Sequence, residues 1–239
     1  MFELNPNLEI KKEIIQGSVV YSADNFYKDP DQVADFLFNR DTPLWKDWEH
    51  PSMNGIHFND KRLIQPDSEL IHVYLLLSEL CGQGQLLKDD FALLTTMTRF
   101  TNNKFNDFEN SIWWPHKDPG YNGIVYFTED ENNGTNLYSP ELESEEEWRL
   151  SRLIKEHEDP WRLKKYYKVI KQFKSKYNRF VFFDGNKFPH GANYTNFYMG
   201  ETPLSEDVFW KEYRCAQTFH FDGRRTLFKV AHRPWWKFW

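Results

Sequence analysis

Cysteine is scarce in this sequence, and long apolar runs are missing. The only two cysteines are Cys81 and Cys215, which suits a reducing compartment and leaves open whether they pair in a disulfide. No apolar run approaches the ~20 residues of a membrane-spanning helix, and residues 1–6 lack the pattern of a signal peptide. We therefore expect a cytoplasmic protein with no membrane partner.

An excess of positive charge is missing as well. The chain has 30 Lys and Arg against 36 Asp and Glu, so its net charge is −6. This balance argues against general binding to nucleic acid. One basic stretch lies within residues 160–179, but it contains no recognised nucleic-acid motif and is interpreted as a solvated helix face. Nucleic acid is not an expected partner.

Aromatic residues, by contrast, are abundant, with 21 Phe, 12 Tyr and 10 Trp among 239 residues. A chain of this length and composition can bury one good core, and nothing in it demands a second domain. We expect a single domain over residues 1–239.

Hydrophobic periodicity predicts two helices early in the chain and strands through much of the remainder. One helix begins at Asp29-Pro30, where Asp29 can cap the N-terminus, and another covers residues 68–80. Residues 41–66 contain three prolines and an Asn-Gly turn, which predicts a loop or irregular ribbon. Strands are predicted at 13–21, 92–100, 110–114, 122–128, 179–184, 212–221 and 225–231. The pattern indicates an α+β domain with a barrel or sandwich core.

Residues 141–177 interrupt the β-rich half. Acidic residues dominate their first part and basic residues their second, with a break at Asp159-Pro160. Apolar residues recur every three or four positions in the second part, at Leu163, Tyr166, Tyr167, Ile170 and Phe173. This spacing predicts a helical insertion.

The segment His116-Lys117-Asp118 carries the first chemical signal. Residues two apart on an extended strand leave the same face, with Cα atoms about 6–7 Å apart, so this imidazole and carboxylate can converge on one ion. A second histidine, His190, follows the apolar strand at 179–184. Two histidines and one carboxylate are the facial ligand set of non-haem Fe(II) oxygenases.

The order of the motifs is more informative than any one of them. After His116-Lys117-Asp118 come the strand at 122–128, a turn at Gly134-Thr135, the apolar strand that leads to His190, and a strand with Arg214 and Thr218. This order resembles the Fe(II)/2-oxoglutarate-dependent dioxygenases, particularly small prolyl-4-hydroxylase-like members. The resemblance covers roughly residues 92–221.

The resemblance implies a fold and an activity. The fold would be a double-stranded β-helix (jelly-roll) core with flanking N-terminal helices and a helical insertion at about 141–177. His116, Asp118 and His190 would be the catalytic iron ligands. Fe(II) would act with 2-oxoglutarate and O2 as cosubstrates. A peptidyl or small-molecule substrate would be hydroxylated, with release of succinate and CO2.

The resemblance also implies a cosubstrate pocket. Arg214 would pair with the distal carboxylate of 2-oxoglutarate, a task that suits a planar guanidinium. Strand alternation puts Arg214, Ala216 and Thr218 on one face and Tyr213, Cys215, Gln217 and Phe219 on the other. Thr218 could therefore add a hydroxyl hydrogen bond, and Tyr126 is assigned to the same pocket. An internal ion pair is the alternative role for Arg214. The spacing from His190 to Arg214 is longer than in the family, so residues 195–211 would form an inserted loop.

Other readings give the same residues different roles. A catalytically silent β-barrel module that binds a metal or ligand is the main alternative, since a fold does not confer activity. A cupin-type enzyme would need an His-x-His motif, and none occurs in the chain. Halogenases of this superfamily have a small residue where Asp118 stands, so hydroxylation is favoured over halogenation.

Overall fold

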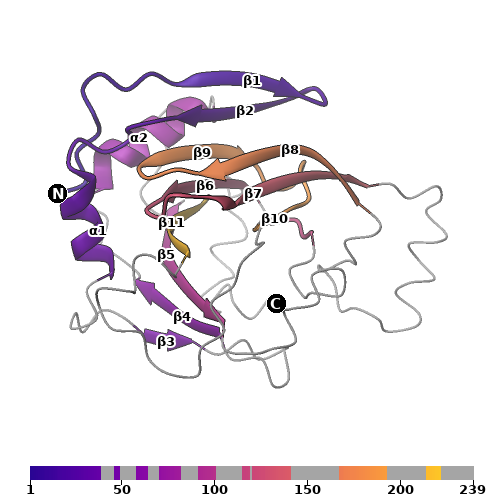
Figure 1. Cartoon of the computed structure of the whole chain (residues 1–239). Coiled ribbons are helices and arrows are strands. Elements are labelled where there is room, and N and C mark those ends of the chain that lie inside the picture. The colour runs from indigo at the N-terminus through magenta and orange to yellow at the C-terminus, as the bar shows by residue number, and fades with distance from the viewer. Residues whose placement is uncertain are drawn as a thin grey trace.

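The computed structural model describes residues 1–38, 46–48, 58–63, 70–81, 91–100, 115–118, 120–140, 167–192 and 214–221. Within these ranges the chain forms two mostly antiparallel sheets and two helices, which agrees with the predicted α+β class (Figure 1). The larger sheet has the order β1-β2-β9-β6-β11-β5-β4-β3, and the smaller has the order β10-β7-β8. The described strands do not close into a barrel.

The elements have the following bounds. The helices are α1 (Pro30–Phe38) and α2 (Ile71–Leu80). The larger sheet contains β1 (Lys11–Ile15), β2 (Ser18–Ala23), β3 (Lys46–Trp48), β4 (Phe58–Leu63), β5 (Phe91–Phe100), β6 (Tyr121–Tyr126), β9 (Arg179–Asp184) and β11 (Arg214–Phe221). The smaller sheet contains β7 (Asp130–Pro140), β8 (Tyr167–Ser175) and β10 (His190–Ala192).

Both predicted helices are confirmed. The Asp29 carboxylate accepts a hydrogen bond from the Gln32 backbone N–H at 3.1 Å, as an N-cap should. α1 and α2 each turn one apolar stripe towards the larger sheet. Neither described helix has the length and apolar character needed to cross a membrane. Cys81 and Cys215 are both free thiols.

The strand predicted over residues 13–21 is wrong in one respect, because the chain reverses in the middle of it. Gln16 and Gly17 have φ values of 46° and 77°, which is the left-handed conformation that a tight hairpin turn requires. β1 and β2 pair on either side, with Ile15 opposite Ser18. Strands β5, β6, β9 and β11 match the predicted ones to within two residues.

The predicted helical insertion is wrong over its last part. Residues 167–175 form β8, which pairs with β7 and buries Phe173 and Ser175 on alternate positions. The same residues also suit a strand, because aromatic and β-branched side chains favour pleated surfaces. Pairing with β7 then selects the strand over the helix. Residues 141–166 lie outside the described part of the chain.

The turn predicted at Gly134-Thr135 is also wrong, since both residues lie inside β7. A Cβ atom at position 134 would collide with the carbonyl oxygen of Phe173 in β8. Glycine at this position therefore allows β7 and β8 to lie close together and does not mark a turn. The loop predicted over 41–66 contains β3 and β4, because β4 pairs with β5 and extends the sheet. The predicted strands at 110–114 and 225–231 and the loop at 195–211 fall outside the described residues.

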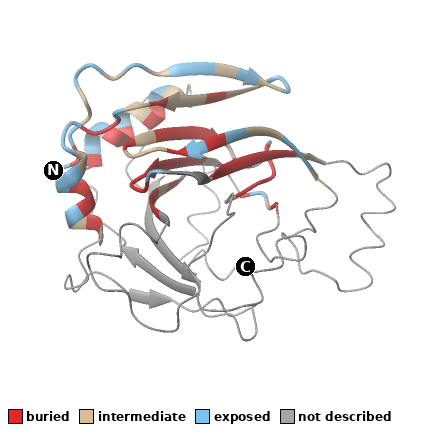
Figure 2. Cartoon of the chain, viewed as in Figure 1, coloured by how far each residue is buried: buried red, intermediate tan, exposed pale blue. Residues whose placement is uncertain are grey.

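Strand alternation divides the core into two hydrophobic clusters. The helix-side cluster contains side chains of the two helices and the larger sheet, and the inter-sheet cluster contains side chains of both sheets. Figure 2 shows the buried residues, in red, along the helices and along strands of both sheets. Along β11, Cys215 and Phe219 belong to the helix-side cluster, whereas Ala216 belongs to the inter-sheet cluster. The predicted alternation of β11 is therefore confirmed for these side chains.

Candidate metal centre

His116 and His190 are held opposite each other by their own backbones. The His116 N–H donates to the His190 carbonyl at 3.0 Å, and the His190 N–H donates to the His116 carbonyl at 2.8 Å. This antiparallel bridge attaches the segment before β6 to β10. The two imidazole rings consequently lie with their centroids 4.6 Å apart.

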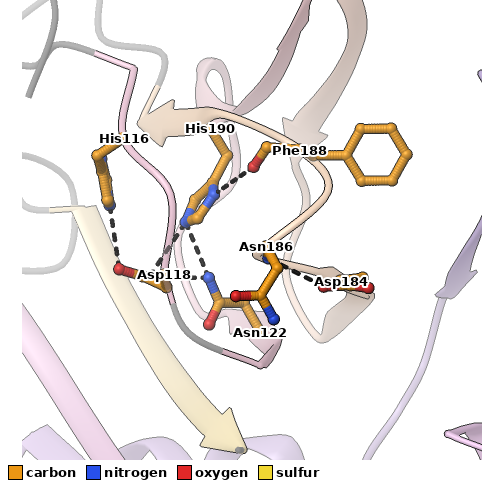
Figure 3. A network of polar contacts seen from close by, with 7 residues as sticks. All are labelled: His116, Asp118, Asn122, Asp184, Asn186, Phe188 and His190. Carbon is orange, nitrogen blue, oxygen red and sulfur yellow. Dashed lines mark hydrogen bonds and ion pairs between the residues drawn. The ribbon is translucent and has the colours of Figure 1, made fainter. Parts of the chain in front are cut away.

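Asp118 completes the group. Its Oδ2 lies 3.2 Å from His190 Nε2, and its Oδ1 lies 3.9 Å from His116 Nε2 (Figure 3). One ligand atom from each of the three residues lies within 4.8 Å of the other two. The carboxylate is buried, with 5% of its side chain exposed. The three residues predicted as ligands are thus brought together.

One hydrogen bond sets the protonation pattern of His190. Its Nδ1 lies 3.0 Å from the Phe188 carbonyl oxygen, which can only accept a hydrogen bond. Nδ1 therefore carries a proton, and in this tautomer Nε2, which lies 3.2 Å from Asp118 Oδ2, is the nitrogen that can bind a metal. A backbone carbonyl that holds the remote nitrogen in this way is the usual support of a metal-binding histidine.

Asn122 was not identified from the sequence, yet it touches two members of the group. Its Nδ2 lies 2.8 Å from Asp118 Oδ2 and 2.8 Å from His190 Nε2. Asn122 is buried and lies in β6, which otherwise consists largely of apolar residues and glycine. A polar side chain four positions after Asp118, inside such a strand, was the signal available in the sequence.

The donor set fits a small divalent cation. Two ligands about 2.1 Å from one metal and at right angles to each other are about 3.0 Å apart. The separation of 3.2 Å between Asp118 Oδ2 and His190 Nε2 is close to that value. Two histidines and one carboxylate also match the ligand preference of non-haem iron sites. This buried group could therefore hold a metal ion.

Of the predicted cosubstrate residues, Tyr126 lies on the inter-sheet face, and Thr218 is two positions after Ala216 of the same face on β11. Tyr126 is fully buried in the inter-sheet cluster, and its hydroxyl donates to Thr135 Oγ1 at 2.6 Å. Thr218 is half-buried and pairs with Ile124 of β6. Arg214 begins β11 opposite Thr98 of β5, and its side chain lies outside what the structure describes.

Comparison of the chain with protein-family models, with curated proteins and with solved structures finds no match.

Proposed function

We propose that this chain is an Fe(II)- and 2-oxoglutarate-dependent oxygenase that hydroxylates a peptidyl or small-molecule substrate. The observation that supports it best is the convergence of His116, Asp118 and His190. They meet at a buried position with the His190 Nε2 lone pair directed inwards. Three ligands arranged on one side of an ion leave positions for a bidentate cosubstrate and for O2.

The path of the chain supports the corresponding fold, a double-stranded β-helix. Strands β9, β6, β11 and β5 are neighbours in the larger sheet. Between β6 and β9 the chain crosses to β7 and β8 of the smaller sheet, and between β9 and β11 it crosses to β10. A jelly roll would require such repeated crossing between two sheets. The bridge from His116 to His190 adds one more segment beside β10.

In this proposal the residues of the chain bind and orient, and the metal supplies the redox chemistry. When bound, Fe(II) would couple O2 to the decarboxylation of 2-oxoglutarate, so that one oxygen atom enters succinate and the other forms the substrate hydroxyl. His116, Asp118 and His190 would hold the ion through Nε2, a carboxylate oxygen and Nε2.

The inter-sheet face would bind the cosubstrate. Its apolar side chains, including Leu137 and Phe183, exclude water from the space between the sheets. Tyr126 and Thr135 form a hydroxyl pair within this apolar surrounding, and Thr218 offers a further hydroxyl. Arg214 would pair with the distal carboxylate, since the alternation predicted from the sequence puts it on the same strand face as Ala216.

The test is succinate release from 2-oxoglutarate. Metal-free protein receives Fe(II) without oxygen, and turnover begins on admission of O2, with and without proline-containing peptides or free amino acids. We expect succinate from the wild type and none from His190→Ala. His72→Ala is the matched control, because His72 is exposed on α2. Bound Fe(II) without succinate would instead indicate a silent metal-binding module.

A further inference from the structure

We propose that Asn122 is an exchangeable partner of the metal centre, which holds Asp118 and His190 together until an ion takes its place on His190. The inference rests on the metal centre of the proposed function. Its starting point is that one amide nitrogen lies 2.8 Å from both Asp118 Oδ2 and His190 Nε2 (Figure 3). An asparagine amide carries two hydrogens, so this nitrogen can donate to both atoms at once.

His190 cannot serve the amide and a metal at the same time. In the tautomer whose Nδ1 proton is donated to Phe188, Nε2 has a single lone pair. Asn122 uses that lone pair in this arrangement. A cation bound to Nε2 must therefore displace the amide hydrogen from His190.

Asp118 is in a different position, because a carboxylate has two oxygens and about four lone-pair sites. Asn122 donates to Oδ2, while Oδ1 lies on the side of His116, 3.9 Å from its Nε2. The bond from Asn122 to Oδ2 can persist while the carboxylate binds an ion. Loading the centre thus costs Asn122 one of these two hydrogen bonds and leaves the other in place.

Close packing keeps the amide at this position. A Cβ atom at position 185 would lie 3.0 Å from Asn122 Nδ2, so Gly185 allows the strand end of β9 to approach the amide. The Gly185 N–H also donates to the Gly120 carbonyl at 2.7 Å, which ties this approach to the segment before β6. Asn122 is buried here, so its contacts are set by the fold.

The test is the Mn(II) affinity of Asn122→Leu, measured by calorimetry on protein stripped of metal. Leucine removes two hydrogen bonds from the metal-free state and one from the loaded state. The bond lost from both states does not change the free energy of metal binding, so only the extra bond lost from the metal-free state counts. We expect Mn(II) to bind about two- to tenfold more tightly than in the wild type, which corresponds to one hydrogen bond. The melting temperature should fall further without Mn(II) than with it. Asn122→Ala gives the same signs if leucine prevents folding.

Asn136→Leu is the matched control. Asn136 is also a buried strand asparagine, but its amide donates to the Tyr138 hydroxyl. Its replacement should lower the melting temperature equally with and without Mn(II).

Unchanged or weaker Mn(II) binding by Asn122→Leu would overturn the inference. If the amide only oriented Asp118 for the metal, its loss would weaken Mn(II) binding instead of strengthening it. A wild type that binds Mn(II) but releases no succinate would contradict the oxygenase alone, whereas one that binds no Mn(II) would overturn both proposals.

Discussion

Buried polar groups on the two faces of the larger sheet are paired in different ways. On the helix side, the Tyr27 hydroxyl donates to Gln217 Oε1 at 2.7 Å, and burial raises the pKa of Tyr27 well above its usual range. On the inter-sheet side, a carboxylate oxygen of Asp118 and Nε2 of His190 approach to 3.2 Å and share the amide of Asn122. The first face pairs one donor with one acceptor, and the second gathers two acceptors.

The two arrangements differ in whether the buried polar groups are already matched to each other. A donor that is matched to an acceptor stabilises a buried position. Two acceptor atoms that converge repel each other unless a donor or a cation lies between them. Their arrangement therefore favours the binding of a donor or a cation. Alternation along the same strands supplies both faces, because β6, β9 and β11 each contribute side chains to the helix-side and inter-sheet clusters.

The largest effect should come from Asp118→Ala, which removes the only carboxylate among the three ligands. We expect Mn(II) affinity to fall by more than ~100-fold, since changes outside the ligand shell already cost 10- to 100-fold. Turnover should be lost while circular dichroism stays that of the folded protein. Asp184→Ala is the control, because its carboxylate accepts from the Asn186 N–H instead. Wild-type affinity in Asp118→Ala would refute the ligand assignment.

Phe180→Ala should act on the opposite face. Phe180 is fully buried and stacks on Phe26 with ring centroids 4.3 Å apart. Truncation should lower the free energy of unfolding by about 3–5 kcal/mol, the range for buried phenylalanine. Urea unfolding measures this loss, and Mn(II) titration of the folded variant should give the wild-type affinity. A parallel loss of affinity would show that the two faces are coupled.

Arg214→Ala should affect the cosubstrate and spare the metal. If Arg214 pairs with 2-oxoglutarate, the apparent KM for 2-oxoglutarate should rise at least about tenfold, or ~1.4 kcal/mol. Fe(II) affinity should change little. Arg179→Ala serves as the comparison, because the Arg179 guanidinium already binds Asp24 at 2.6 Å. An unchanged KM in Arg214→Ala would assign the carboxylate clamp to another residue.

Asp24→Asn should give the smallest effect, and one that depends on pH. A hydrogen bond from Arg179, with Lys176 also nearby, lowers the pKa of Asp24 from 3.8 to about 2. Because the folded pKa is the lower one, the ionised carboxylate stabilises the fold above about pH 4, and this contribution is lost as the pH falls through about 2. The pair is partly exposed, so less than about 1 kcal/mol is expected. Urea unfolding at pH 6 and pH 2 should show a difference between variant and wild type that disappears in acid; a constant difference would exclude this origin.

Local signals predicted the helices and the three residues that converge at the candidate metal centre. Asp29-Pro30 marks the start of α1, and the spacing of His116 and Asp118 with a later His190 marks the metal group. Each depends on a few neighbouring residues whose geometry is fixed by the backbone. The turn at Gln16-Gly17 is also local, but it lies inside a continuous β-like pattern that predicts an unbroken strand.

Non-local contacts explain what the sequence did not reveal. β8 is a strand because β7 lies beside it, although its apolar spacing also suits a helix. Gly134 is needed because Phe173 approaches from another strand. Asn122 gains its role only when His190, 68 positions away, is brought to its amide. A short stretch of sequence holds no pattern that reveals such contacts between distant residues.

The backbone bridge between His116 and His190 also determines when the metal centre can form during folding. Asp118 and His190 are 72 positions apart, so the chain must close a long loop and place β10 before the ligands meet. Closing such a loop costs entropy and makes the contact a late one. During synthesis, His116 and Asp118 leave the ribosome well before His190 exists. Metal loading should therefore follow folding, and an ion added to the unfolded chain should not speed its refolding.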